Sequence, residues 1–167
     1  NKPANNSFKT LAVVSVVSVG FCLVLMGLRV LSAASFSEAL HLITSGWEQG
    51  PLFSVWKAMS GDAVYADRYK LPFAVSYYNW LFYKSYGWFA GFVLGAFGLA
   101  DAWLPTAARL FTAIGMALGA AVCYASFVVV AKIEDRWVKL LALSFALFVF
   151  FGPLVGFWGF TVRPEVW

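Results

Sequence analysis

Two carboxylates of this chain stand where they could do chemistry. The 167 residues include eight acidic and twelve basic ones. Glu48 lies in the stretch WEQG, just after a short amphipathic segment, and Glu165 lies in the stretch RPE, directly after a long uncharged run. An ionisable residue near hydrocarbon is costly and tends to be kept for function. Two such groups could divide the work, with Glu48 as a general base and Glu165 as a ligand of a divalent metal ion.

Both carboxylates also have plain structural interpretations. Glu48 could face water at the start of a helix, and Glu165 could occupy the first turn of a helix after Pro164, where the helix dipole favours an anion. Spacing alone leaves these alternatives open. Asp62 and Asp67 are secondary candidates, because their surroundings are more typical of turns and loops.

Several cations could bind a phosphate or diphosphate carried by a lipid, because charge-assisted hydrogen bonds to phosphate are strong. Ordinary contact with lipid head groups is the alternative. The phosphate candidates are Lys57, Lys84 and Arg163, with Arg68 as a secondary one. We interpret His41 as an interfacial polar residue, and the two cysteines as small buried hydrophobes without metal-ligand spacing.

Composition limits what can position these groups. The chain is 62% hydrophobic and 12% charged, whereas soluble domains carry about 25% charge. An all-α integral membrane protein is therefore expected. The net charge of +4 is spread too thinly to indicate nucleic acid as a partner. Membrane lipid is the expected surrounding, and we expect the 167 residues to be one membrane domain of a longer chain.

Uncharged runs predict three transmembrane helices, at about residues 10–31, 108–131 and 138–160, the last with a kink at Pro153. The loop over 35–104 contains further helical patterns, which we interpret as helices lying in the membrane interface. They cover residues 35–44, residues 46–59 with Lys57 on the exposed side, and residues 77–97. The uncharged run in the last of these is too short for an ordinary span.

Charge bias predicts the orientation. The basic segment KIEDRWVK, residues 132–139, and the N-terminus with its two lysines are both expected in the cytoplasm. Three spans satisfy both assignments, whereas counting 77–97 as a fourth would not. The loop 35–104 and the tail 161–167 then share the outer face of a bacterial-type cytoplasmic membrane. Glu48 and Glu165 are expected to meet there.

Several short motifs, in this order, resemble a known family. They are EQG at 48–50, GDAVYAD at 61–67, YNWL at 78–81, RL at 109–110 and RPE at 163–165. The chain resembles the N-terminal part of the polyprenyl-phosphate-dependent glycosyltransferases of the C superfamily (GT-C). Aminoarabinose transferases and protein O-mannosyltransferases belong to that superfamily.

The resemblance implies an inverting glycosyltransferase that takes its sugar from a polyprenyl phosphate. It also implies that Glu48 is the catalytic base and that Glu165 helps to hold a metal. Many relatives have Asp or Asp-Glu where this chain has Trp47-Glu48, and Pro-Leu where it has Trp80-Leu81. The alternative, from a different class, is a non-catalytic subunit that packs in a larger membrane-protein complex. Gly91–Gly95 and Gly115–Gly119 would suit close helix contacts in such a complex.

Overall fold

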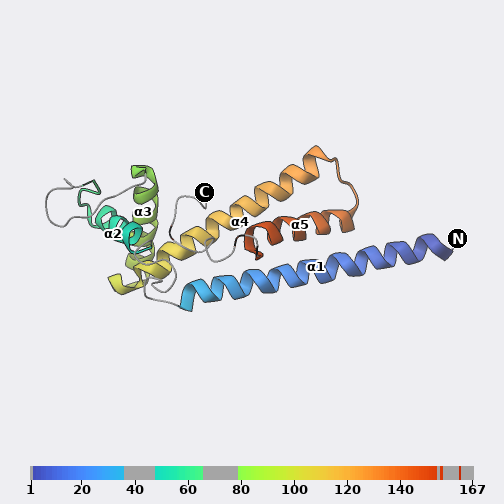
Figure 1. Ribbon diagram of the computed structural model, residues 1–167, viewed down its shortest axis with the longest axis horizontal. Helices are drawn as coiled ribbons and strands as arrows, with labels where there is room; N and C mark the ends of the chain where they lie inside the picture. Colours follow the sequence, from blue (N-terminus) through green and yellow to red (C-terminus); the bar gives the residue numbers. More distant parts are fainter. Residues whose placement is uncertain (1, 36–47, 66–78, 154, 156–161, 163–167) are drawn as a thin grey trace. The chain divides into compact units, whose positions relative to one another are not determined.

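The computed structural model describes residues 2–35, 48–65, 79–153, 155 and 162. These residues form helices and turns, and none of them lies in a strand (Figure 1). They belong to two compact units. The first unit is made of residues 1–30 and 114–159, and the second of residues 31–113 and 160–167.

Within the part of the chain that the structure describes, two helices are long and apolar enough to cross a membrane. They are residues 7–35 of α1 (Lys2–Ser35) and residues 101–130, which include α4 (Leu104–Val130). Each exceeds the roughly 20 residues that a bilayer requires. Apolar side chains face outward along both, among them Val17 at 64% exposure and Val122 at 66%. Helices with this pattern are typical of a membrane protein.

Within the first unit, α1 runs parallel to α5 (Arg136–Phe151). The Ser15 hydroxyl donates to the Trp137 carbonyl at 3.0 Å, and the Cys22 thiol donates to the Ser144 carbonyl at 3.3 Å. Both helices advance by seven residues between these two contacts, in the same direction. Small polar side chains allow such close approach between membrane helices.

The second half of α4 packs antiparallel to α5 in the same unit. A Cβ added at Gly119 would lie 2.5 Å from the Phe150 ring, so only glycine fits there without movement of that ring. Further along, Phe127 and Phe145 meet edge to face, with ring centroids 5.5 Å apart. The connection after α4 ends at Asp135, whose carboxylate accepts hydrogen bonds from two backbone N–H groups of the first turn of α5.

Helix α5 ends before Pro153. Gly152 has an extended backbone, with φ −79° and ψ −178°. Helical backbone angles are disfavoured at this position, because the ring of a following proline clashes with the preceding residue. The sequence predicts a span over 138–160 with a kink at this proline. The structure instead has the end of a helix at Phe151, because Gly152 leaves the helical region. Residues 156–161 lie outside the described part, so the third span stays a prediction.

The second unit contains α2 (Gln49–Ser60), α3 (Trp80–Phe97), the 3-10 turn η1 (Asp101–Trp103) and the start of α4. Local sequence sets the helix ends. Asn79 caps α3 by accepting from the Leu81 N–H at 2.9 Å. Gly61 and Gly98 end α2 and α3 at φ +82° and +61°, a conformation that favours glycine.

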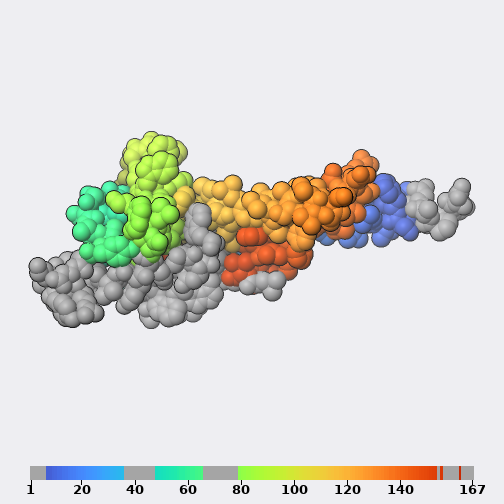
Figure 2. All heavy atoms as spheres, turned by 90° about the horizontal axis from the view of Figure 1, so that it is seen from above, coloured from blue at the N-terminus to red at the C-terminus, as the bar shows by residue number. Residues whose placement is uncertain are grey.

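Helices α2 and α3 lie side by side (Figure 2). A Cβ at Gly87 would lie 3.0 Å from the Met59 backbone nitrogen, so the absence of a side chain allows the two backbones to approach. The core around this contact is mainly aromatic and aliphatic. Its buried members are Leu52, Val55, Val64, Tyr83, Tyr86, Ala90, Leu94, Leu104, Ala107, Ala108 and Val162.

The helices predicted over 46–59 and 77–97 correspond to α2 and α3. Their placement in a membrane interface stays a prediction. The helix predicted over 35–44 lies outside the described residues except for Ser35, which is the last residue of α1.

Candidate functional site

Glu48 and Arg109 form a buried ion pair in the second unit. The Arg109 Nε–H donates to Glu48 Oε1 at 2.9 Å, and its Nη2 donates to Oε2 at 2.7 Å. Both side chains are 1% exposed. This side-on, two-point geometry matches the planar guanidinium to the planar carboxylate. Glu48 precedes the first residue of α2, whereas Arg109 lies in the second turn of α4.

A third donor reaches the same carboxylate. The backbone N–H of Val162 points at Glu48 Oε1, with 3.4 Å between nitrogen and oxygen. Val162 is itself fully buried and belongs to the core of the second unit. It directly precedes the stretch RPE. Three segments that are far apart in the sequence therefore meet at Glu48.

The buried core of the second unit, which includes Ala108 next to Arg109, also holds a polar contact. Thr112, one helical turn after Arg109, exchanges a 2.7 Å hydrogen bond with the hydroxyl of Tyr86, and both groups are buried. The edge of the Phe111 ring meets the Tyr86 ring, with centroids 4.9 Å apart. Removing two charges from water costs several kcal/mol for each ion, and only good pairing offsets this. The two short hydrogen bonds supply such pairing.

The burial of Glu48 excludes one of its two interpretations, namely that it faces water at the start of a helix. Glu48 does not face water, because its side chain is 1% exposed. Its two oxygens accept from a guanidinium, so this arrangement can hold a carboxylate and a cation together in an apolar place. To accept a proton from a substrate, one of these buried oxygens would first have to become accessible to that substrate.

The expectation that Lys57 lies on the exposed side of its helix is wrong. Lys57 is 5% exposed, and its ammonium donates to the Val64 carbonyl at 2.7 Å. The ammonium also lies 5.2 Å from the centroid of the Phe53 ring. The lysine is buried because the chain turns back at Gly61 and brings the Val64 carbonyl within reach. The ammonium thus fastens the segment after α2 to the helix.

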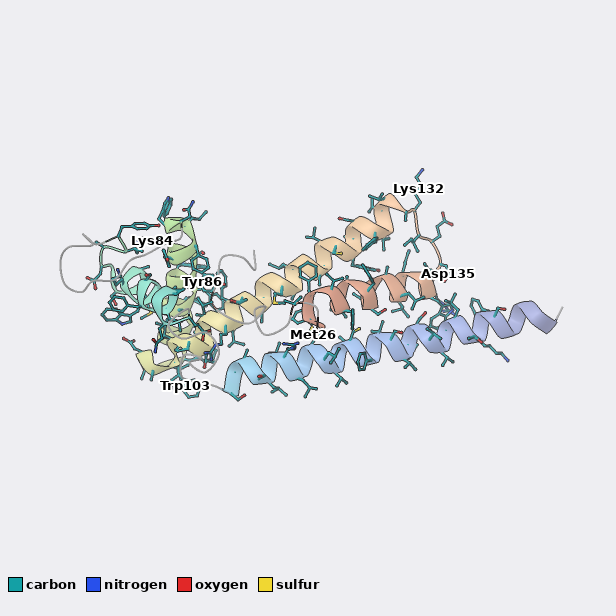
Figure 3. All side chains as sticks on the ribbon, viewed as in Figure 1. Met26, Lys84, Tyr86, Trp103, Lys132 and Asp135 are labelled. Atoms are coloured by element: carbon teal, nitrogen blue, oxygen red, sulfur yellow. The ribbon has the colours of Figure 1, made fainter. Side chains whose placement is uncertain are left out.

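The other predicted site residues are spread differently. Lys84 is exposed on α3 (Figure 3). Asp62 is exposed in the turn after α2. Asp67, Arg68, Arg163 and Glu165 lie outside the described residues. Of the predicted set, the structure therefore brings only Glu48 into a defined polar site among the residues it describes.

The expected divalent metal finds no fitting donor set in the described part of the chain. No three His, Cys, Asp or Glu side chains gather there. The oxygens of Glu48 face the guanidinium of Arg109, whose positive charge opposes a cation at the same place. A metal at Glu165 stays a prediction from the sequence.

Sequence reasoning did not select Arg109 as a site residue. In the sequence, Arg109 stands out only as half of the motif RL, near the start of the span predicted over 108–131. A signal was available, because an arginine at the beginning of an apolar helix needs a partner when it is buried. The partner lies 61 residues earlier, so spacing could not identify it.

Comparison of the chain with protein families, with curated proteins and with solved structures found no match.

Proposed function

We propose that the chain is part of a membrane glycosyltransferase, which moves a sugar from a polyprenyl phosphate to an acceptor on the outer face of the cytoplasmic membrane. The meeting of three segments at Glu48 carries this proposal. Two of the residues that contact one another there, Glu48 and Arg109, belong to motifs of the family resemblance. The third, Val162, directly precedes another such motif.

The charged nature of the pair adds support. A buried ion pair can often be replaced by well-packed apolar residues with no loss of stability. Stability alone therefore does not account for charges at this place. Chemistry that needs a carboxylate does account for them, because Glu48 is kept in a defined orientation by donors on two other segments.

In the proposed reaction Glu48 is the general base. It takes the proton of the acceptor hydroxyl while the hydroxyl oxygen attacks the anomeric carbon of the sugar. The bond from that carbon to the phosphate oxygen breaks with inversion, and its electron pair leaves with the polyprenyl phosphate. The buried carboxylate must first become accessible to the acceptor. The Val162 N–H, at 3.4 Å, makes a longer contact with Glu48 than either nitrogen of Arg109 does, so it is the weakest of these contacts.

The leaving phosphate requires a cation, since positive charge stabilises the negative charge that develops on it. Arg163 enters the proposal in this role from the sequence alone, as the residue after Val162. Glu165 and a divalent metal enter in the same way, and no step depends on them here. Lys57 is not included, because its ammonium is bound to the Val64 carbonyl.

The alternative of a non-catalytic subunit rests partly on glycines that could contact a partner helix. Gly119 packs against Phe150 of the same chain, and a Cβ at Gly91 would lie 3.2 Å from the Met59 side chain. These two glycines serve contacts within the chain, so they do not favour the subunit over the enzyme.

The test is Glu48→Gln in the full-length protein. Membranes that contain it are incubated with radiolabelled polyprenyl-phosphate hexoses and pentoses, and loss of label from each donor is measured. Transfer should fall by about 10²–10⁴-fold, the usual contribution of a general base. Glu134→Gln, at an exposed position before α5, is the matched control and should transfer normally.

A second variant separates catalysis from folding. Glu48→Gln leaves Arg109 buried without its charged partner, which itself destabilises a protein. The double variant Glu48→Gln/Arg109→Met removes both charges and should recover stability without recovering transfer. Normal transfer by either variant would contradict the role of Glu48 as the base.

A further inference from the structure

A groove on the second unit combines a cation with an apolar floor. It has a volume of about 470 Å³ and lies between α2 and α3. Its lining residues are Ala58, Met59, Lys84, Gly87, Trp88, Gly91 and Phe92. The volume falls in the range of about 300–1,000 Å³ that is usual for small-molecule sites.

The residues of α3 in this groove follow the helical repeat. Lys84, Trp88 and Phe92 are four residues apart and therefore share one face of the helix. The Trp88 and Phe92 rings are stacked within 17° of parallel, with 6.3 Å between centroids. They are 73% and 64% exposed. The groove thus has the charge of Lys84 at one end, and the rings of Trp88 and Phe92 line one side of it.

Glycines form the floor beside this row. Gly87 and Gly91 lie one helical turn apart, and Met59 of α2 approaches both of them. With no side chains on these glycines, the groove stays open between Met59 and the aromatic row. Lys84 is exposed, and no ion pair joins it to another residue of the described ranges.

We propose that this groove binds an anionic phospholipid of the bilayer. Lys84 holds the phosphate of the head group, and one acyl chain lies between Met59 and the rings of Trp88 and Phe92. Charge complementarity at Lys84 supports this occupant, and so do the aromatic residues, because tryptophan favours the boundary between head groups and hydrocarbon. The inference is independent of glycosyl transfer.

The experiment measures lipid binding by native mass spectrometry of the full-length protein released from detergent micelles. Phosphatidylglycerol is compared with phosphatidylcholine of the same chains. Near a membrane surface one lysine contributes about fivefold to the affinity for an anionic lipid. Lys84→Gln should therefore weaken the tightest phosphatidylglycerol site about fivefold. Lys132→Gln, at an exposed position of the first unit, should not weaken it.

A second pair of variants tests the apolar floor. Gly91→Leu fills the groove, and the flexible Met59 side chain can move to admit it. Gly95→Leu places the same side chain one turn further on, where an added Cβ meets nothing within 4 Å. Only Gly91→Leu should lose the tight site, while both variants keep their helix content by circular dichroism.

Three results would overturn the proposal. Equal affinity for the two lipids would remove the role of charge, and tight binding by Gly91→Leu would remove the groove. Displacement of the lipid by free glycerol phosphate would show a simple anion site with no use for the acyl chain.

Discussion

Arg109 holds Glu48 side-on, with its Nε and Nη2 on the two oxygens of one carboxylate at 2.9 and 2.7 Å. The contact joins the residue before α2 to the second turn of α4, across 61 residues of sequence. Neither charge could remain in this apolar place alone, because an unpaired buried ion is far more costly than a paired one. The two residues therefore form one unit in stability as well as in any chemistry.

Arg109→Met should destabilise the protein by about 3–5 kcal/mol, because the Glu48 carboxylate stays buried without its partner. The double variant Arg109→Met/Glu48→Gln should recover most of this loss. Chemical denaturation in mixed micelles measures both changes. Arg136→Met, at an exposed position of α5, is the control. A double variant no more stable than Arg109→Met would mean that the two residues are not coupled.

Gly87→Ala should lower the free energy of unfolding by about 1–3 kcal/mol, the usual cost of overpacking. The new Cβ would lie 3.0 Å from the Met59 nitrogen, and a backbone atom cannot move aside cheaply. Gly95→Ala meets nothing within 4 Å and should stabilise α3 by up to about 1 kcal/mol. The same denaturation assay compares the two. Equal effects would refute the close approach of α2 and α3.

Lys57→Met should cost about 1–3 kcal/mol, because the Val64 carbonyl loses the ammonium that donates to it. Methionine keeps much of the aliphatic length of lysine, so the change isolates the charged end. Lys84→Met removes an exposed lysine and should shift stability by less than about 0.5 kcal/mol. Proteolysis of the segment after α2 provides a local measurement. It should become faster only in the Lys57 variant.

Asp135→Ala should destabilise the start of α5 by about 1 kcal/mol, because two N–H groups lose their acceptor. Asp135→Asn retains an oxygen acceptor and should lose only a fraction of that amount. Amide exchange at Trp137 and Val138 reports the change directly. The neighbouring Glu134→Ala should leave that exchange unchanged, and faster exchange there would point to a general effect of charge.

Much of the helical framework follows from local sequence. The uncharged runs of α1 and α4 indicate membrane-length helices, because apolar side chains on every face suit hydrocarbon. The positions of Asn79, Gly98 and Asp135 agree with helix ends, since a capping oxygen or a left-handed glycine acts within a few residues. Such effects need no knowledge of the rest of the fold.

The site depends on contacts that local sequence does not contain. The helical pattern of residues 46–59 predicts that Lys57 is exposed. The turn at Gly61 instead brings the Val64 carbonyl within reach of its ammonium. The contact between Arg109 and Glu48 depends on the packing of α2, α3 and α4 into one core. Pairing between distant segments is set by tertiary packing, so a pattern of single residues could nominate Glu48 but not its partner.

If α5 begins the third span that the sequence predicts over 138–160, its parallel direction with α1 limits how the chain between them can cross the bilayer. Two helices that cross a bilayer in the same direction leave their carboxyl-terminal ends in the same compartment, whichever way the protein is inserted. The polypeptide between them must then return across the bilayer an odd number of times, and α4 is the candidate in the described ranges for a single return. Reporter domains joined after Ser35 and after residue 160, the end of the predicted third span, should then agree on their compartment, even before that compartment is identified.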